Sequence, residues 1–242
     1  MTRRRWIANT FTDSTASLIG AQAEHLARVL RAQPGTEADI VANGHVYRAT
    51  ISHVSLEEVR FTLLEELTSE PALPITLALA IFKFDRMEWA IEKTTELGVA
   101  NIVPIIARRT EKHLAQAADK RVERWRRIAH ESAKQSRRAG IPTIAEPLAL
   151  ANYLAQPSSA QHILLAEDEH KTTLRQRIES TLNTSSSELP HFELAIGPEG
   201  GWTSEEAAIF AKHNWQPASL GPRILRAETA AIAALSITTA LL

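Results

Sequence analysis

The sequence predicts an α/β protein: a parallel sheet preceded by a small β-rich domain. Continuous apolar runs recur at residues 75–81, 102–106, 162–166 and 192–196, and helical patterns separate them. Such runs are typical of strands that are buried on both faces, and their alternation with helices indicates a parallel sheet. Nearer the N-terminus, short β-like runs flank Asn43-Gly44, which is the strongest short signal for a hairpin.

Residues 1–70 contain several β-like runs and one short helical pattern, which together predict a small barrel. The runs cover residues 5–9, 36–42, 45–51 and 59–63, and the helix covers residues 21–31. Pro71 and Pro74 limit helix formation and strand pairing, so we place a short linker there. The predicted domains are therefore residues 1–70 and residues 74–242.

Composition excludes several classes of function. The chain of 242 residues has a net charge of −1 and no cysteine, so disulfides and thiolate-based metal or nucleophile chemistry are excluded. Residues 1–6 are basic, but no apolar segment of signal-peptide or transmembrane length follows them. We therefore expect a cytoplasmic protein without membrane contact.

In the second domain, a helix predicted over residues 86–97 ends at Gly98, a typical residue after a helix C-terminus. Pro104 in the strand at 102–106 suggests an edge strand or a bulge. A fifth strand is predicted at residues 217–220, and a helix almost free of charge at 227–242. A helix that apolar is buried or forms an interface, so we predict a homodimer through it.

Two strand-to-helix junctions carry glycine and proline where the strand ends. Gly197-Pro198-Glu199-Gly200-Gly201 follows one strand, and Gly221-Pro222 follows the next. Glycines there let backbone amides approach a ligand, and parallel sheets bind ligands at these strand ends. The pattern is neither a dinucleotide fingerprint nor a Walker loop, which favours a nucleotide-like ligand without a triphosphate. The alternative is that both Gly-Pro pairs are simple turns.

Local signals support both junctions. Thr203 and Glu206 have the spacing of a capping box at the start of a helix. Glu228 lies at the start of the last helix, where the helix dipole favours a carboxylate, and its simplest role is to cap that helix.

Positive charge is concentrated in one region of this neutral chain. Between Arg108 and Arg138 there are eleven Lys or Arg and four Asp or Glu. A helix predicted over residues 119–138 has a buried stripe and a second, cationic stripe. The cationic stripe is either a solvated face or a site for phosphate groups.

Three glutamates, Glu88, Glu92 and Glu96, recur at every fourth position of the helix at 86–97. Like charges at this spacing repel unless they are paired. We predict that they pair with arginines of Arg108-Arg109 or of the basic helix. A metal site is the alternative, but it lacks histidine, and we expect no metal.

The two junctions together closely resemble the ribosomal small-subunit methyltransferase E family, the 16S rRNA (uracil-N3)-methyltransferases of the SPOUT superfamily. The resemblance rests on Ile-Gly-Pro-Glu-Gly-Gly at 196–201 and Leu-Gly-Pro-Arg-Ile-Leu-Arg-Ala-Glu-Thr at 220–229. Further family signatures match residues 83–88 and 92–98, Gln135 to Arg138, and His25 to Gly35. The resemblance covers nearly the whole chain.

This resemblance implies a fold, a cofactor and a substrate. It implies a PUA-like RNA-binding domain at residues 1–70 and a SPOUT domain at 74–242 whose C-terminal part forms a deep trefoil knot. The knot would hold S-adenosyl-L-methionine in a bent conformation, and the substrate would be 16S rRNA, on the assembled small subunit. SPOUT relatives complete their sites across a dimer interface, which agrees with the predicted homodimer.

The resemblance also assigns roles to residues. The predicted catalytic residues are Arg223 and Arg226, which would stabilise a deprotonated uracil, and Glu228, which could accept its N3 proton. The predicted cofactor residues are Ile196, Gly197, Glu199, Gly200, Gly201, Leu220, Gly221, Ile224, Leu225 and Thr229. The predicted RNA-binding residues are Arg3, Arg4, Arg5, Arg31, Arg108, Arg109, Arg124, Arg127, Lys134, Arg137 and Arg138.

Alternatives stay open at this point. Arg3, Arg4 and Arg5 could instead form a solvated terminus. The chain could be a SPOUT enzyme that methylates another RNA position, such as a ribose 2′-hydroxyl, or an RNA-binding assembly factor that has lost its chemistry.

Overall fold

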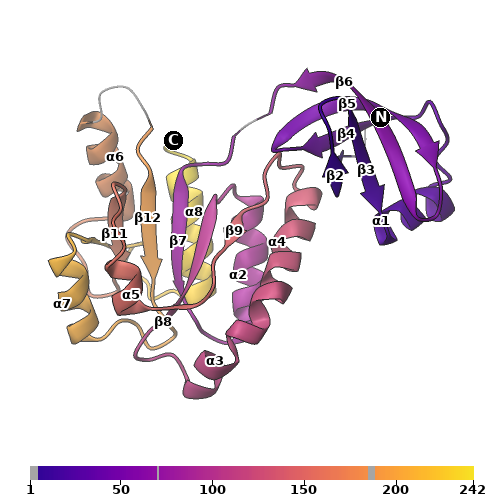
Figure 1. The fold of residues 1–242 in the computed structure, drawn as a ribbon. Helices are drawn as coiled ribbons and strands as arrows, with labels where there is room; N and C mark the ends of the chain where they lie inside the picture. Colours follow the sequence, from indigo (N-terminus) through magenta and orange to yellow (C-terminus); the bar gives the residue numbers. More distant parts are fainter. Residues whose placement is uncertain (1–4, 70, 185–188) are drawn as a thin grey trace. The chain divides into compact units, whose positions relative to one another are not determined.

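The computed structural model describes residues 5–69, 71–184 and 189–242. The chain divides into two compact units, residues 1–71 with 133–140, and residues 72–132 with 141–242. Figure 1 shows a β-rich first unit and a second unit in which helices and strands alternate. The predicted α/β class, with a smaller β domain at the N-terminus, is therefore confirmed.

The first unit is built on a six-stranded sheet in the order β1-β4-β5-β6-β3-β2. Asn43 and Gly44, with φ of 50° and 77°, form the predicted turn between β4 and β5. Strands β2 and β3 were not predicted, because residues 10–19 are rich in Thr and Ser and lack a clear alternation. The elements are β1 (Arg5–Ile7), β2 (Thr10–Phe11), β3 (Thr15–Ile19), α1 (Ala21–Glu24), a π-helical turn (His25–Val29), β4 (Glu37–Ala42), β5 (His45–Val54) and β6 (Glu58–Leu67).

Two apolar clusters stabilise the first unit. The larger one includes Leu18, Ile40 and Phe61, all fully buried. The smaller one packs Ile7, Val41 and Val46 against Ala133 and Ala139. This second cluster explains why residues 133–140 group with the first unit although they are distant from it in sequence.

The second unit contains a seven-stranded parallel sheet in the order β10-β8-β7-β12-β11-β13, with β9 paired to β8. Five strands match the predicted ones. The two-residue strands β9 and β10 are too short to leave a hydrophobic pattern. The strands are β7 (Ile75–Ala80), β8 (Asn101–Ile106), β9 (Thr143–Ile144), β10 (Leu148–Ala149), β11 (Gln161–Leu165), β12 (Phe192–Ile196) and β13 (Gln216–Ala218).

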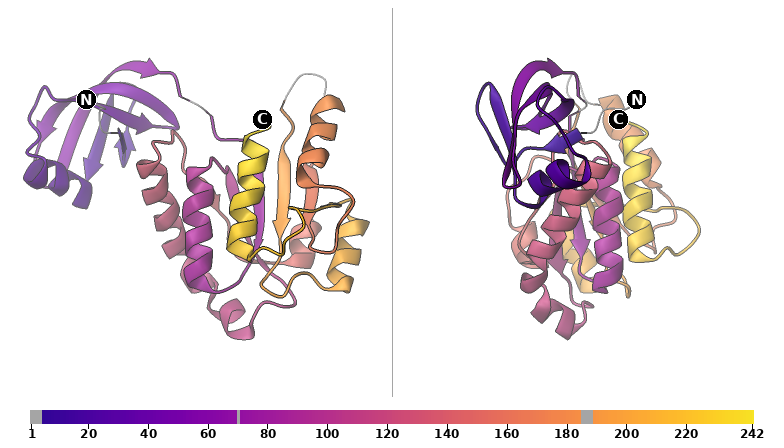
Figure 2. Two further views of the ribbon diagram at one scale, coloured as in Figure 1. Left: turned by 180° about the vertical axis from the view of Figure 1, so that it is seen from behind. Right: turned by 90° about the vertical axis from the view of Figure 1, so that its right-hand side faces the viewer.

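Helices cover both faces of this sheet (Figure 2). The main core packs α2 (Phe84–Glu96), α4 (Val122–Gln135), α6 (Leu174–Thr184) and α8 (Ala227–Thr239) on one face. A second core packs α5 (Leu150–Leu154) and α7 (Ser204–Lys212) on the other. Helix α3 (Lys112–Ala117) and a 3₁₀ turn (Asp119–Arg121) connect β8 to α4. No helix in the described ranges is long and apolar enough to span a membrane.

Several local predictions are confirmed and one is wrong. Gly98 has φ of 100° just beyond α2, as expected of a residue that follows a helix. Pro104 is neither on an edge strand nor at a bulge, because β8 lies between β7 and the short strands β9 and β10. Pro104 falls between the residues of β8 that pair with β9 and those that pair with β10. Its missing N–H group is tolerated at this break.

The strand order brings the functional loops together. Strands β12, β11 and β13 are neighbours and run parallel, so their carboxyl ends lie at one edge. The loops that follow them are the two glycine-containing junctions and the segment after β11.

Candidate active site

A cavity of about 560 Å³ lies at the carboxyl ends of β11, β12 and β13. Its wall is made of the loops after these three strands and the first turn of α8. The lining residues are Leu164–Asp168, His170, Ile196–Glu199, Gly201–Ser204, Ala207, Ala218–Leu225, Ala227 and Ala230. Segments from three strand ends therefore form one pocket, as expected for a ligand site of a parallel sheet.

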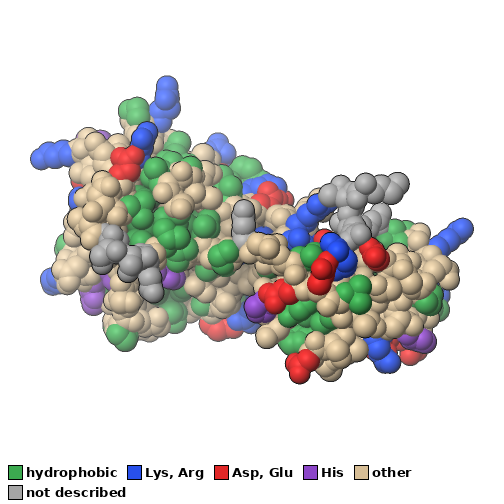
Figure 3. All heavy atoms as spheres, turned by 90° about the horizontal axis from the view of Figure 1, so that it is seen from above, with side chains coloured by type: hydrophobic (Ala, Val, Ile, Leu, Met, Phe, Trp, Pro, Cys, Tyr) green, Lys and Arg blue, Asp and Glu red, His purple; other side chains and the backbone are tan. Residues whose placement is uncertain are grey.

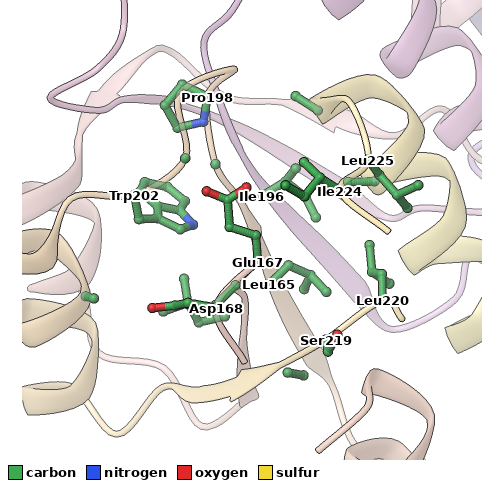
Figure 4. Close-up of a pocket in the computed structure, with 18 of the residues that line it drawn as sticks. Leu165, Glu167, Asp168, Ile196, Pro198, Trp202, Ser219, Leu220, Ile224 and Leu225 are labelled. Atoms are coloured by element: carbon green, nitrogen blue, oxygen red, sulfur yellow. The ribbon is translucent and has the colours of Figure 1, made fainter. Parts of the chain in front are cut away.

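The cavity has one polar and one apolar side. Glu167, Asp168 and the indole nitrogen of Trp202 lie on one side, and Leu220 and Leu225 lie on the other (Figure 4). The Nε1 atom of Trp202 is buried and has no hydrogen-bond partner among the described residues. The pocket thus offers two carboxylates, an unused N–H donor and an apolar surface.

Three glycines after β12 are each confined by a neighbouring side chain. A Cβ atom added at Gly197 would lie 3.2 Å from Nε1 of Trp202, and one at Gly200 would lie 3.1 Å from Cδ of Arg109. Gly201 has φ of 70°, and its Cβ would lie 3.1 Å from Oε1 of Glu167. At each of the three positions a larger residue would require the neighbouring side chain to shift by a few tenths of an ångström. At Gly200 the occupant of this space is another part of the chain, and not a ligand.

Gly221 differs from these three. It has φ of 118°, and an added Cβ would meet no atom within 4 Å. Its amide donates to Oγ of Ser219 at 3.1 Å, and that hydroxyl donates to the Gly221 carbonyl at 3.2 Å. Glycine is required here by the left-handed backbone, and open space beside it belongs to the cavity.

The start of α7 is fixed by the predicted capping box, which is confirmed. The Glu206 amide donates to Oγ1 of Thr203 at 3.2 Å, and the Thr203 amide donates to Oε2 of Glu206 at 2.9 Å. The other oxygen of Glu206 accepts from the Arg108 amide at 2.8 Å. Glu206 is buried, so it ties the loop after β8 to the loop that carries Trp202.

Most of the predicted cofactor residues line the cavity. Gly200 and Thr229 are not among the lining residues, since Gly200 faces Arg109 and Thr229 is exposed on α8. The predicted residues in the lining are Ile196, Gly197, Glu199, Gly201, Leu220, Gly221, Ile224 and Leu225. Ile224 is 82% exposed, so it is available to a ligand or to another chain.

The three predicted catalytic residues have different surroundings. Arg223 lines the cavity, and Arg226 is the exposed residue that precedes α8. Neither side chain makes a hydrogen bond or ion pair with a described residue, so both guanidinium groups are available. Glu228 is only 4% exposed and does not line the cavity. Its Oε1 lies 3.9 Å from Nε of Arg86, whereas Oε2 has no hydrogen-bond partner among the described residues.

Part of the predicted RNA-binding set lies in the first unit. Arg5 donates to the carbonyl of Arg137, and Nζ of Lys134 lies 5.9 Å from the centre of the Trp6 ring. Burial lowers the pKa of Arg138. The side chain of Arg31 is free of hydrogen bonds and ion pairs with described residues. Arg3 and Arg4 lie outside the described residues.

The remaining predicted RNA contacts lie in the second unit. Arg124 donates to both oxygens of Glu88, at 2.6 and 2.7 Å, and this pairing raises the pKa of Arg124. Arg127 is exposed and has no ion pair with any described residue. Arg109 bonds to backbone carbonyls of Gly200 and Trp202, and the amide of Arg108 bonds to Glu206. On the face drawn in Figure 3, cationic and anionic side chains are interspersed.

The glutamates of α2 follow the predicted pairing only in part. Glu88 pairs with Arg124 and with Arg121, whose Nη1 lies at 3.9 Å. For Glu92 and Glu96 the prediction is wrong, because both bond to Nζ of Lys93 on the same helix, at 2.7 and 2.8 Å. Among the described residues, no group of three or more His, Asp or Glu side chains could hold a metal ion.

Sequence reasoning missed Glu167, Asp168 and Trp202 as residues of the cavity. The first two follow β11, so the rule that assigned ligand binding to strand ends could have found them. Trp202 follows Gly201 directly, so its position beside a glycine-containing strand end was the signal in the sequence.

Two family models match the chain. An RNA methyltransferase domain matches residues 69–239, and an RNA methyltransferase PUA domain matches residues 18–64. The ribosomal RNA small subunit methyltransferase E of Synechocystis is 34% identical over 95% of this chain and 74% of the relative. The chain belongs to the ribosomal RNA small subunit methyltransferase E family.

A further relative and two solved structures agree with this assignment. The Bacillus subtilis protein is 31% identical over 92% of this chain and 88% of its own length. The crystal structure of the Neisseria gonorrhoeae protein, bound to S-adenosyl methionine, matches with a TM-score of 0.82 and 27% identity over 99% of this chain and 98% of that one. A putative methyltransferase from Legionella pneumophila, in complex with the same cofactor, matches with a TM-score of 0.81 and 30% identity over the same shares of the two chains.

Proposed function

We propose that this chain transfers a methyl group from S-adenosylmethionine to N3 of a specific uridine in 16S rRNA. The observation that carries this proposal is the cavity at the ends of β11, β12 and β13. Its wall combines loops whose glycines expose backbone groups with both polar and apolar side chains. Membership of the methyltransferase E family supports the substrate class, and two related structures that contain the cofactor support the ligand.

The residues of the cavity fit the proposed cofactor. Leu220, Ile224 and Leu225 offer an apolar surface for the adenine ring, whereas Glu167 and Asp168 can accept hydrogen bonds from ribose hydroxyls or an ammonium group. Open space beside Gly221 lets its backbone approach the ligand closely. S-adenosylmethionine would supply an electrophilic methyl group attached to a sulfonium.

Uridine N3 carries a proton and is a poor nucleophile until that proton leaves. Arg223 and Arg226, which have no partners among the described residues, can place positive charge beside the uracil oxygens and so stabilise the deprotonated base. The enzyme would also accelerate methyl transfer by holding N3 in line with the methyl group of the cofactor. A role of Glu228 as proton acceptor stays a prediction, and its burial outside the cavity lining gives no support to it.

RNA recognition is proposed to divide between the two domains, residues 1–70 and 74–242. In the first, Arg31 is the stronger candidate phosphate contact, because Arg5 already donates to the carbonyl of Arg137. Lys134, Arg137 and Arg138 belong to the same compact unit as these two arginines. In the second, exposed Arg127 is the strongest candidate, because Arg124 and Arg109 are already bonded to protein groups. Among the described residues, the Arg108 amide bonds to Glu206 and its guanidinium makes no hydrogen bond or ion pair, so this side chain remains a candidate RNA contact.

We further propose a cytoplasmic homodimer acting on the small ribosomal subunit, with a C-terminal trefoil knot around the cofactor. Helix α8 supports the dimer: Ala230, Ile232, Ala233 and Ile237 remain only half-buried within a single chain. These apolar positions would lose their remaining contact with water against a second copy.

The proposal is tested by transfer of a labelled methyl group from S-adenosylmethionine to small ribosomal subunits that lack the modification. We expect label in 16S rRNA that depends on the wild-type protein. Cofactor binding by calorimetry without any transfer would instead identify an RNA-binding assembly factor.

A further inference from the structure

Two arginine side chains hold the loop at residues 197–201, here called the cofactor loop, at two adjacent residues. Arg109 follows β8, and Arg86 lies in the first turns of α2. Neither lines the cavity. Both contact residues of the loop that forms one part of the cavity wall.

Arg109 holds the backbone of the cofactor loop. Its Nη1 atom donates to the carbonyl of Gly200 and lies 3.5 Å from the carbonyl oxygen of Trp202. The aliphatic stem of Arg109 fills the space where a Cβ atom of Gly200 would lie, 3.1 Å from Cδ. Glycine at position 200 therefore makes room for Arg109. In turn, Arg109 bonds to two carbonyl groups that have no backbone donor among the described residues.

Arg86 holds the one side chain of the cofactor loop that carries charge. Its Nη1 donates to Oε1 of Glu199 at 2.6 Å, and Nζ of Lys83 lies 4.0 Å from the other oxygen. The Nε atom of Arg86 lies 3.9 Å from Oε1 of Glu228. Arg86 thus bridges a carboxylate of the loop and a carboxylate at the start of α8.

Glu228 is the buried one of the two carboxylates that Arg86 contacts. Its side chain is 6% exposed, and Arg86 is the cation that lies beside it among the described residues. A buried carboxylate without a cation would be strongly unfavourable, so the position of Arg86 is constrained by Glu228. Glu199, whose side chain is 34% exposed, is the more accessible of the two carboxylates that Arg86 contacts.

We infer that Arg86 and Arg109 are positioning residues that hold the cofactor loop in its binding conformation before the ligand arrives, with Glu228 anchoring Arg86. The inference rests on the proposed function only for the identity of the ligand. A loop that is already ordered loses less conformational entropy on binding, so the two arginines raise affinity without contacting the ligand.

The first test measures the loop without any ligand. Amide hydrogen exchange across residues 199–203 should be faster in Arg86→Gln and in Arg109→Lys than in the wild type, by about tenfold if each variant loses one charge-assisted contact. Arg175→Gln is the matched control, because it removes a guanidinium paired to Glu179 on the exposed face of α6. Exchange rates unchanged in both loop variants would overturn the inference.

The second test separates positioning from general stability. Arg86→Gln alone leaves Glu228 buried without a cation and should lower both the melting temperature and the affinity for S-adenosylmethionine. Adding Glu228→Gln removes the uncompensated charge, so the melting temperature should recover while the affinity stays about tenfold below wild type. An affinity that recovers together with stability would assign Arg86 a merely structural role and overturn the inference.

The two tests also distinguish this inference from the proposed function. A wild-type protein that binds no S-adenosylmethionine would contradict the proposed function, and the exchange measurement would still decide whether the arginines order the loop. A wild type that binds the cofactor, with variants that match it in exchange and affinity, would overturn the inference alone.

Discussion

At the scale of single residues, Gly221 combines a backbone conformation that favours glycine with a position in the wall of the cavity. Its φ of 118° is unfavourable for any other residue, and the space beside it is open. We expect Gly221→Val to abolish measurable binding of S-adenosylmethionine by calorimetry, because the side chain strains the loop and enters the cavity. Gly140→Ala is the control, since Gly140 lacks a positive φ and also has open space beside it. Wild-type affinity in Gly221→Val would place the ligand elsewhere.

A substitution of Trp202 tests whether the polar side of the cavity contacts the cofactor. Its buried Nε1 atom has no partner among the described residues, so a ligand acceptor is the group that would satisfy it. Trp202→Phe should lower cofactor affinity by about tenfold and leave the melting temperature near that of the wild type, because no protein hydrogen bond is lost. Equal affinity in a titration of both proteins would show that the indole does not reach the ligand.

Residue-scale predictions from sequence succeeded where the cause was local. The spacing of Thr203 and Glu206 predicted a cap that depends only on one helical turn, and the structure contains both of its hydrogen bonds. The space beside Gly200 accommodates Arg109, which lies 91 residues earlier in the chain, whereas the contact of Gly200 with a cofactor stays a prediction. Sequence spacing carries no information on such a contact, because it arises only when the sheet brings the loops after β8 and β12 together.

At the scale of elements, α4 offers a direct comparison of a paired and an unpaired arginine. Arg127 is exposed and without an ion pair among the described residues, whereas Arg124 is bonded to Glu88. If α4 binds phosphate, Arg127→Gln should reduce the slope of log affinity against log salt by about one unit, and Arg124→Gln should change it much less. A salt titration of rRNA binding measures both slopes. Identical slopes in wild type and Arg127→Gln would mark this face of α4 as merely solvated.

Helices and strands were predicted from the sequence where their hydrophobic pattern repeats over several turns or several residues. Long apolar strands and amphipathic helices such as α2 and α4 follow from periodicity. The two-residue strands β9 and β10 and the Thr-rich strand β3 do not, because their pairing depends on neighbours that the sheet supplies. The prediction of an edge strand or a bulge at Pro104 was wrong for the same reason. The missing N–H group of Pro104 falls at a break between the partner strands β9 and β10.

At the scale of the whole molecule, the half-buried apolar residues of α8 lead us to predict a dimer. The chain has a mass of 26.7 kDa, so light scattering at micromolar concentration should give about twice that value. Ile237→Glu, which places a charge on the half-buried apolar surface of α8, should shift the mass towards that of a single chain. A wild type that scatters as a single chain would contradict the proposed homodimer.

We propose that the cavity at the strand ends directs a methyl group to N3 of a uridine in 16S rRNA. The most direct measurement is mass spectrometry of nucleosides from small-subunit rRNA after incubation with the protein and isotope-labelled S-adenosylmethionine. We predict one labelled product, N3-methyluridine, which is absent when Arg223 and Arg226 are both replaced by Gln. Label found on a ribose 2′-oxygen, on another base, or not at all would contradict it.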